Sequence, residues 1–292
     1  MTRCHKVKKL SPKHKKYGIL YKNGGAFMGK YEDTVRLWQS YGIASESDLD
    51  TYLSNFRIIF AYNSGKIENA DISYHDTREI FENGQVTGYT GETRAIFEQQ
   101  NQKLCYEFLR EKIVKKEPIS VELIREIHRT LTSGTYDERR YVENGERPGE
   151  FKKHDYVTGI HEVGSPVETV AEDLQELVDE VNEYTGQQYL RVGAYLHARF
   201  ESIHPFADGN GRVGRTLLNY YFMINNQPPL VVYAEDKGFY YACLNKYDEQ
   251  EQLSSLEEFL KYEVEKTWEK ALSLSQGEAP QHKPLNDILF GM

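Results

Sequence analysis

Apolar residues recur every three or four positions along most of this chain, a spacing typical of amphipathic helices. The ranges that show it are 48–60, 91–113, 120–131, 167–184, 188–202, 211–224 and 255–274, and a further helix begins near Thr34. Residues 154–163, HDYVTGIHEV, differ because they are short, β-branched and split by Gly159, which is typical of a small β-hairpin. The pattern therefore predicts a mostly α fold, a helical bundle with one short β-hairpin.

Composition narrows the class of protein. The chain has 292 residues, 39% of them hydrophobic, which is enough for a substantial core. We expect no contact with a membrane, because no apolar run approaches the ~20 residues that span a bilayer. We also expect no nucleic-acid partner, because the net charge is −9. Cys4, Cys105 and Cys243 form neither a metal-type pair nor a disulfide framework, so we expect a cytoplasmic protein.

The most informative segment is residues 204–215, HPFADGNGRVGR, which joins two predicted helices. Pro205 ends the first helix, and residues 208–211 stand at the N-terminus of the second. Glycines there allow backbone N–H groups to turn toward one point, and the helix dipole adds partial positive charge. The loop is therefore expected to form a cradle for an anion.

Charged residues in this loop suit phosphate chemistry. Arg212 and Arg215 are three positions apart and suit phosphate oxygens. Asp208 beside phosphates would be repelled unless a cation lay between, which indicates Mg²⁺, and His204 can act as a general base near neutral pH. The Walker A pattern and the kinase motifs do not occur, so an ordinary ATPase or kinase is not expected.

The same segment resembles the signature of the Fic family, His-x-Phe-x-Asp/Glu-Gly-Asn-Gly-Arg-x-x-Arg, and matches every specified position. The resemblance extends in order and spacing over roughly residues 90–275 and implies a Fic-type helical core. It divides the chain into a basic, flexible segment (1–33), a helical N-terminal region (34–89), the core (90–275) and a C-terminal tail (276–292). The seven Lys or Arg residues within 1–16 receive no assigned role.

Members of this family mostly transfer AMP from ATP to a protein hydroxyl. The resemblance implies that His204 takes the proton from a Tyr, Thr or Ser hydroxyl and that Asp208 holds Mg²⁺. Residues implied to bind the nucleotide are Gly209, Asn210, Gly211, Arg212, Arg215, Tyr240 and Tyr241. It is equally consistent with the sequence that Tyr240 and Tyr241 are core residues on a helix. Asp248 replaces the Asn of several relatives near the base, and residues 154–163 would be a flap that aligns the target protein.

Residues 64–69, SGKIEN, resemble the inhibitory motif of one class of the family, Ser/Thr-x-x-x-Glu-Gly/Asn. Ser64, Glu68 and Asn69 fill its specified positions. A Glu on an adjacent helix can pair with Arg215 and withhold it from the γ-phosphate. The leading hypothesis is thus an autoinhibited protein adenylyltransferase that also modifies itself, with a homodimer expected from the family.

Three alternatives stay open. One is an enzyme that both adds and removes AMP, and another transfers a different group, such as UMP. The third is a nucleotide-binding regulator without transfer activity. The intact His204 and Asp208 count against this last alternative, because a protein that only binds nucleotide needs neither.

Overall fold

The structure is a computed structural model that describes residues 30–156 and 164–277. Helices dominate, and the described residues contain no β-strand. In chain order the elements are α1 (Lys30–Ser40), α2 (Glu46–Tyr52), α3 (Phe56–Glu68), α4 (Tyr74–Asn83), α5 (Thr93–Lys115), α6 (Val121–Thr132), η1 (Arg139–Glu143), α7 (Val170–Glu183), α8 (Tyr189–Ile203), α9 (Asn210–Ile224), η2 (Ala234–Asp236), α10 (Lys237–Gln250) and α11 (Ser254–Ser275).

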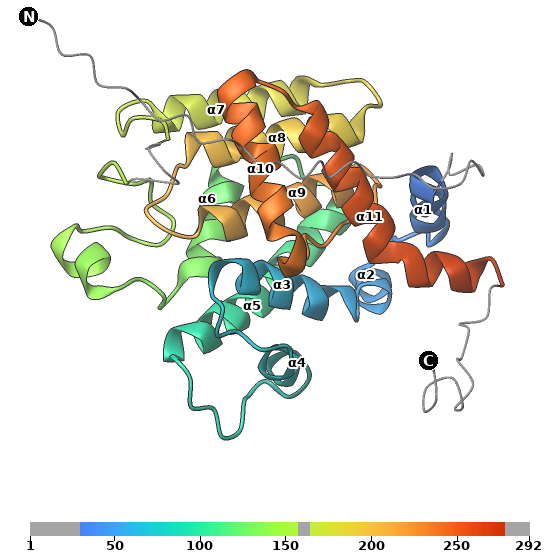
Figure 1. Cartoon of the computed structure of the whole chain (residues 1–292), viewed down its shortest axis with the longest axis horizontal. Helices are drawn as coiled ribbons and strands as arrows, with labels where there is room; N and C mark the ends of the chain where they lie inside the picture. The colour runs from blue at the N-terminus through green and yellow to red at the C-terminus, as the bar shows by residue number, and fades with distance from the viewer. Residues whose placement is uncertain (1–29, 157–163, 278–292) are drawn as a thin grey trace, which may run out of the picture.

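Helix α9 lies at the centre of the bundle, with its sides covered by neighbouring helices (Figure 1). It packs against α8 and α6 and also contacts α3 and α5. Most of its residues are buried, because hydrophobic side chains lie on nearly every face, from Val213 to Phe222. This position fixes the N-terminus of α9, and with it the motif loop, against several other elements.

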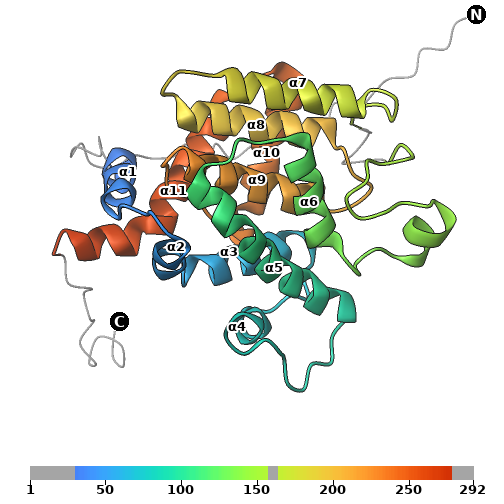
Figure 2. The same cartoon turned by 180° about the vertical axis from the view of Figure 1, so that it is seen from behind.

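The N-terminal helices cover one side of this bundle. Helix α5 lies on the near side of the bundle in the view of Figure 2, and it contacts α9, α3 and α4. Ile58, Ala61, Ile80 and Phe81 form a small second core between α3 and α4. Helix α3 is thereby held between α5 and α9, which brings residues 64–69 to the motif loop.

The mostly helical fold predicted from the pattern is confirmed, with differences at particular elements. The single helix predicted over 48–60 is wrong: Ser45 and Asp48 form a capping box that begins α2 earlier, and a turn after Tyr52 separates it from α3. Helix α1 begins at Lys30, inside the segment expected to be flexible. The remaining predicted helices are found within about three residues of their expected ends.

Two helices were not predicted by the apolar spacing, α4 and α10. Helix α4 buries only Thr77, Ile80 and Phe81, and its ends are marked by the Ser73 N-cap and by Gly84 at φ 73°. The predicted hairpin at 154–163 lies partly outside the described residues, which end at Tyr156 and resume at Gly164, and residues 154–156 are not a strand. The hairpin therefore stays a prediction.

Candidate active site

The motif loop is closed by one of its own side chains. Asn210 Oδ1 accepts a hydrogen bond from the Phe206 backbone N–H at 3.0 Å, and its Nδ2 donates to the Phe206 carbonyl at 2.7 Å. The buried Phe206 ring stacks on His128 with 3.7 Å between ring centroids. His128 Nε2 in turn lies 3.0 Å from the Asp208 carbonyl oxygen. The Asn210 side chain thus shapes the loop by joining its two ends.

Two glycines of this cradle have different roles. Gly209 has φ +84°, which side-chain-bearing residues rarely adopt, and it leads directly into α9. A Cβ on Gly211 would lie 2.5 Å from Glu68 Oε1 and 3.0 Å from Arg215 Nη1, so a larger residue there would displace the ends of these two side chains. The carboxylate of Glu68 therefore lies over the positive end of α9, where the sequence predicted an anion.

A cavity of about 960 Å³ opens at this helix terminus. Its lining includes every motif residue with a predicted role, His204, Asp208, Gly209, Asn210, Gly211, Arg212 and Arg215, together with Glu68, Asn69, Tyr240, Tyr241 and Asp248. Ser64 lies directly behind, buried against Arg215. The structure thus brings together residues from α3, α8, α9 and α10 that are far apart in the sequence.

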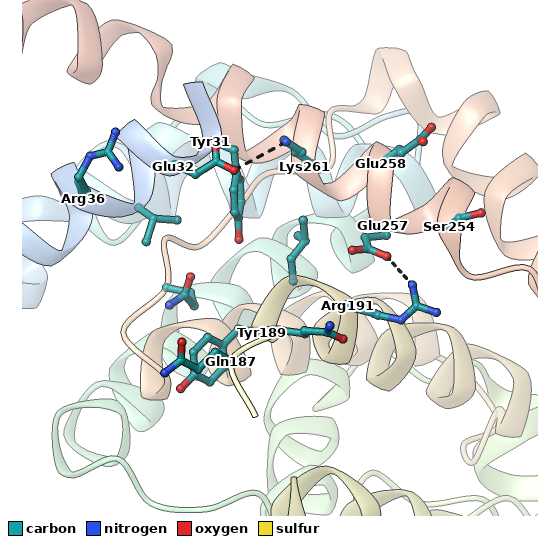
Figure 3. Close-up of a pocket in the computed structure, with 14 residues that line it drawn as sticks. Tyr31, Glu32, Arg36, Gln187, Tyr189, Arg191, Ser254, Glu257, Glu258 and Lys261 are labelled. Carbon is teal, nitrogen blue, oxygen red and sulfur yellow. Dashed lines mark hydrogen bonds and ion pairs between the residues drawn. The ribbon is translucent and has the colours of Figure 1, made fainter. Parts of the chain in front are cut away.

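A second groove, of about 840 Å³, lies between α1, the start of α8 and α11 (Figure 3). Two ion pairs join side chains of its lining: Lys261 lies 4.0 Å from Glu32, and Arg191 lies 3.1 Å from Glu257. The motif residues line the first cavity instead, so that cavity is the candidate active site.

Arg215 is held by the segment that resembles the inhibitory motif. Its Nη2 donates to Glu68 Oε1 at 2.7 Å and to the Ser64 carbonyl oxygen at 2.9 Å, and its Nε donates to Ser64 Oγ at 3.1 Å. Asn69 caps the C-terminus of α3, and its Oδ1 accepts from the Asp71 backbone N–H. Helix α3 therefore ends with Glu68 directed at Arg215.

Asp208 is surrounded by arginines. Arg94 of α5 donates to Asp208 Oδ2 at 2.7 Å, and Arg212 lies 3.6 Å from Oδ1. Burial acts to raise the pKa of Asp208, but Arg212, Arg94 and Arg140 outweigh it and hold that pKa below its usual value. Asp208 is therefore a carboxylate at neutral pH. No cluster of three or more metal-ligating side chains occurs in residues 30–156 and 164–277, so Asp208 would be joined by phosphate oxygens and water in holding Mg²⁺.

His204 follows the last residue of α8 and adopts the left-handed conformation, with φ 51°. Burial, reinforced by the charge of Lys152, lowers its pKa to about 4. Its imidazole is therefore neutral at pH 7 and able to accept a proton. Glu201, one turn before it, has its pKa raised to about 8 by burial, so it is mostly protonated at neutral pH.

The two tyrosines expected near the base differ in environment. Tyr240 is buried, and its hydroxyl lies within hydrogen-bond distance, 2.7 Å, of His197 Nε2. Tyr241 is 38% exposed at the rim of the cavity. Tyr240 thus has the environment of a core residue, whereas Tyr241 offers an accessible ring face.

Comparison with known proteins bears on the middle of the chain. The Fic/DOC family model matches residues 118–222, which contain the motif loop and the helices on both sides of it. Residues 118–222 are a Fic domain. The helices that supply Glu68, Arg94 and Tyr241 lie outside this match.

Relatives share more than the Fic domain. Protein adenylyltransferase fic-1 of Caenorhabditis elegans is 29% identical over 211 residues, which cover 70% of this chain and 38% of that protein. Protein adenylyltransferase Fic of Drosophila willistoni is 28% identical over 232 residues, which cover 77% of this chain and 43% of that protein. A Fic-domain-containing signaling protein from Bacteroides thetaiotaomicron has the same fold, with a TM-score of 0.73, 23% identity and coverage of 88% of this chain and 100% of that one. The chain spans about two fifths of the length of these two curated relatives.

Two residues beside the cradle of the Fic domain belong to no motif in the sequence. Arg94 and Glu98 of α5 line the cavity and contact Asp208 and Arg212. Their spacing of four predicts a pair on one helix face, but no local signal links α5 to a loop 114 positions away. Within residues 30–156 and 164–277, every helix is too short or too polar to span a membrane.

Proposed function

We propose that this protein transfers AMP from ATP to a Tyr, Thr or Ser hydroxyl of a protein, and that Glu68 restrains the reaction. The observation that carries the proposal is the single cavity that holds His204, Asp208 and the N-terminus of α9. A general base, a lone carboxylate and an anion cradle are the groups that nucleotidyl transfer requires. The names of the curated relatives, protein adenylyltransferases, support AMP as the transferred group.

In this mechanism the neutral His204 accepts the proton of the target hydroxyl. The hydroxyl oxygen bonds to the α-phosphorus, the bond from that phosphorus to the bridging oxygen breaks, and pyrophosphate leaves. Backbone N–H groups at the start of α9 bind phosphate oxygens, and Arg215 pairs with the γ-phosphate once Glu68 releases it. Mg²⁺ held by Asp208 would neutralise charge on the phosphates.

Restraint follows from competition for the same positive groups. Glu68 Oε1 is 2.7 Å from Arg215 Nη2 and lies over Gly211. A γ-phosphate and the Glu68 carboxylate cannot both occupy that place, because both are anions that need the same donors. ATP would therefore bind with its α-phosphate misaligned until α3 shifts.

The acceptor is expected to lie along residues 154–163, where an extended segment of the target protein would be aligned beside His204. The chain has 22 tyrosines, so self-modification is expected as well. A Glu68→Gly variant incubated with ATP and Mg²⁺, followed by peptide mass spectrometry, tests the proposal. AMP should be found on Tyr, Thr or Ser residues and should be absent with Glu68→Gly/His204→Ala. A phosphate or UMP adduct from the matching nucleotide, or no adduct with any nucleotide, would overturn it.

A further inference from the structure

Each carboxylate oxygen of Asp208 accepts a hydrogen bond in this structure. Its Oδ2 accepts from Arg94 Nη2 at 2.7 Å, and its Oδ1 accepts from the Gly209 backbone N–H at 2.7 Å. Arg94 belongs to α5, outside the motif and outside the matched Fic domain. A guanidinium is therefore bound to one of the two oxygens that Asp208 can offer to a divalent cation.

Arg94 is held in place by a second carboxylate. Its Nε donates to Glu98 Oε1 at 2.9 Å, and Arg212 Nη1 lies 3.2 Å from the same oxygen. Glu98 is only 2% exposed, and its Oε2 has no hydrogen-bond partner among the described residues. Glu98 Oε2 can therefore accept a hydrogen bond from Arg94 or Arg212 if the contact between Arg94 and Asp208 is broken.

The charges of this cluster are balanced. Asp208 and Glu98 carry two negative charges, and Arg94 and Arg212 carry two positive charges. A divalent cation that entered alone would have to break the Arg94–Asp208 pair and would lie beside two guanidinium groups. A nucleoside triphosphate brings negative charge to the same place, so it would compensate both the metal and the displaced Arg94.

We propose that Arg94 is a positioning residue that keeps Asp208 closed to a free divalent cation, so that metal enters the site together with nucleotide. The proposal rests on the proposed function for the assignment of Asp208 as the metal carboxylate. In this proposal Arg94 controls when the metal binds relative to the nucleotide, and it takes no part in the transfer of AMP. Glu98 retains Arg94 near the cavity when the metal is bound.

Binding of Mn²⁺ to the full chain without nucleotide tests this directly, with free Mn²⁺ measured by electron paramagnetic resonance. Arg94→Gln should bind Mn²⁺ at least about tenfold more tightly than the wild type, because one charge-assisted bond no longer competes for Asp208. Arg94→Lys should give a smaller gain, since it keeps the charge but loses the planar fork. The gain should disappear in Arg94→Gln/Asp208→Asn. Thermal denaturation establishes that each variant is folded.

Arg140→Gln is the matched control, because Arg140 also acts on Asp208 through its charge but is bonded to Asp137. Its effect on Mn²⁺ affinity should stay below about threefold. An unchanged or weaker affinity in folded Arg94→Gln, or a gain that persists without Asp208, would overturn the proposal. The Mn²⁺ measurement involves no transfer step, so the two proposals can fail separately. If the protein transfers AMP but Arg94→Gln leaves its Mn²⁺ affinity unchanged, only the proposal for Arg94 is refuted. The expected Mn²⁺ result in a protein that transfers no AMP would refute the proposed function alone.

Discussion

Arg215 and Glu68 are 147 positions apart in the chain, yet their guanidinium and carboxylate groups are joined at 2.7 Å. Arg215 is buried at 2% side-chain exposure, whereas Glu68 is 36% exposed at the edge of the cavity. The partner that can move is therefore Glu68, on the last turn of α3. Under the proposed function, the pairing of Arg215 with Glu68 would decide whether Arg215 can bind a γ-phosphate.

Glu68→Gly should change nucleotide preference. With Arg215 paired to Glu68, ATP and ADP are expected to bind with similar affinity, because the γ-phosphate has no free guanidinium. Without Glu68, ATP should gain about tenfold over ADP through a charge-assisted pair with Arg215. Calorimetric titration of both nucleotides measures the ratio. Glu107→Gly, an exposed position on α5, is the control for a Gly substitution in a helix. A gain that remains after Arg215→Gln is added would contradict the explanation.

His204 should stay neutral far below the usual range of histidine. Burial and Lys152 lower its pKa to about 4, against ~6.5 for an ordinary histidine, so the base form predominates above pH 4. NMR of histidine-labelled protein, with the His204 signal assigned from His204→Ala, should give a titration midpoint about two units below the ordinary value. A midpoint at or above the ordinary value would show that burial does not control this group.

Asn210→Ala should destabilise the motif loop. The side chain makes two buried hydrogen bonds with the Phe206 backbone, and both would be lost. We expect the free energy of unfolding to fall by about 2 kcal/mol, measured by urea denaturation, together with weaker nucleotide binding. Asn83→Ala removes an exposed amide that bonds only to Glu79 and should cost well under half as much. Equal losses in the two variants would contradict the shaping role of Asn210.

Acid should weaken the fold before carboxylates are protonated. Burial lowers the pKa of His128 to about 3, and its Nδ1 accepts a hydrogen bond from the Gly149 backbone N–H at 2.8 Å. The unfolded chain binds a proton at this histidine below pH ~6.5, whereas the native state stays neutral, so stability falls with falling pH. His128 alone should lower the free energy of unfolding by about 2 kcal/mol between pH 7 and pH 5.

Urea denaturation at pH 7, 6 and 5 measures this dependence. A constant free energy of unfolding over this range would contradict the neutral state assigned to His128.

Local signals were sufficient for much of the fold. Helix α6 lies within one residue of the range predicted for it, 120–131, and Ser120 caps it, because its hydroxyl accepts from the backbone N–H of Leu123. Helices α8 and α9 flank the motif loop where Pro205 and the glycines placed its ends. These features depend on residues within a few positions of one another, which is the range over which a single sequence is informative.

Tertiary contacts explain what the sequence did not predict. The Asn210 side chain bonds to its own loop, so its chemistry could not be separated from that of a phosphate ligand without geometry. Arg94 reaches Asp208 only because α5 packs against α9. Tyr240 and Tyr241 are adjacent in sequence, yet one is buried beside His197 and the other exposed.

Transfer of label from ATP tests the central claim most directly. Wild type, Glu68→Gly and Glu68→Gly/His204→Ala are incubated with Mg²⁺ and with ATP labelled at either the α- or the γ-phosphorus, and label on protein is followed with time. We predict label only from the α-phosphorus, at least about tenfold faster with Glu68→Gly than with wild type, and none with the double variant. Label from the γ-phosphorus, equal rates for wild type and Glu68→Gly, or transfer that persists without His204 would contradict the account.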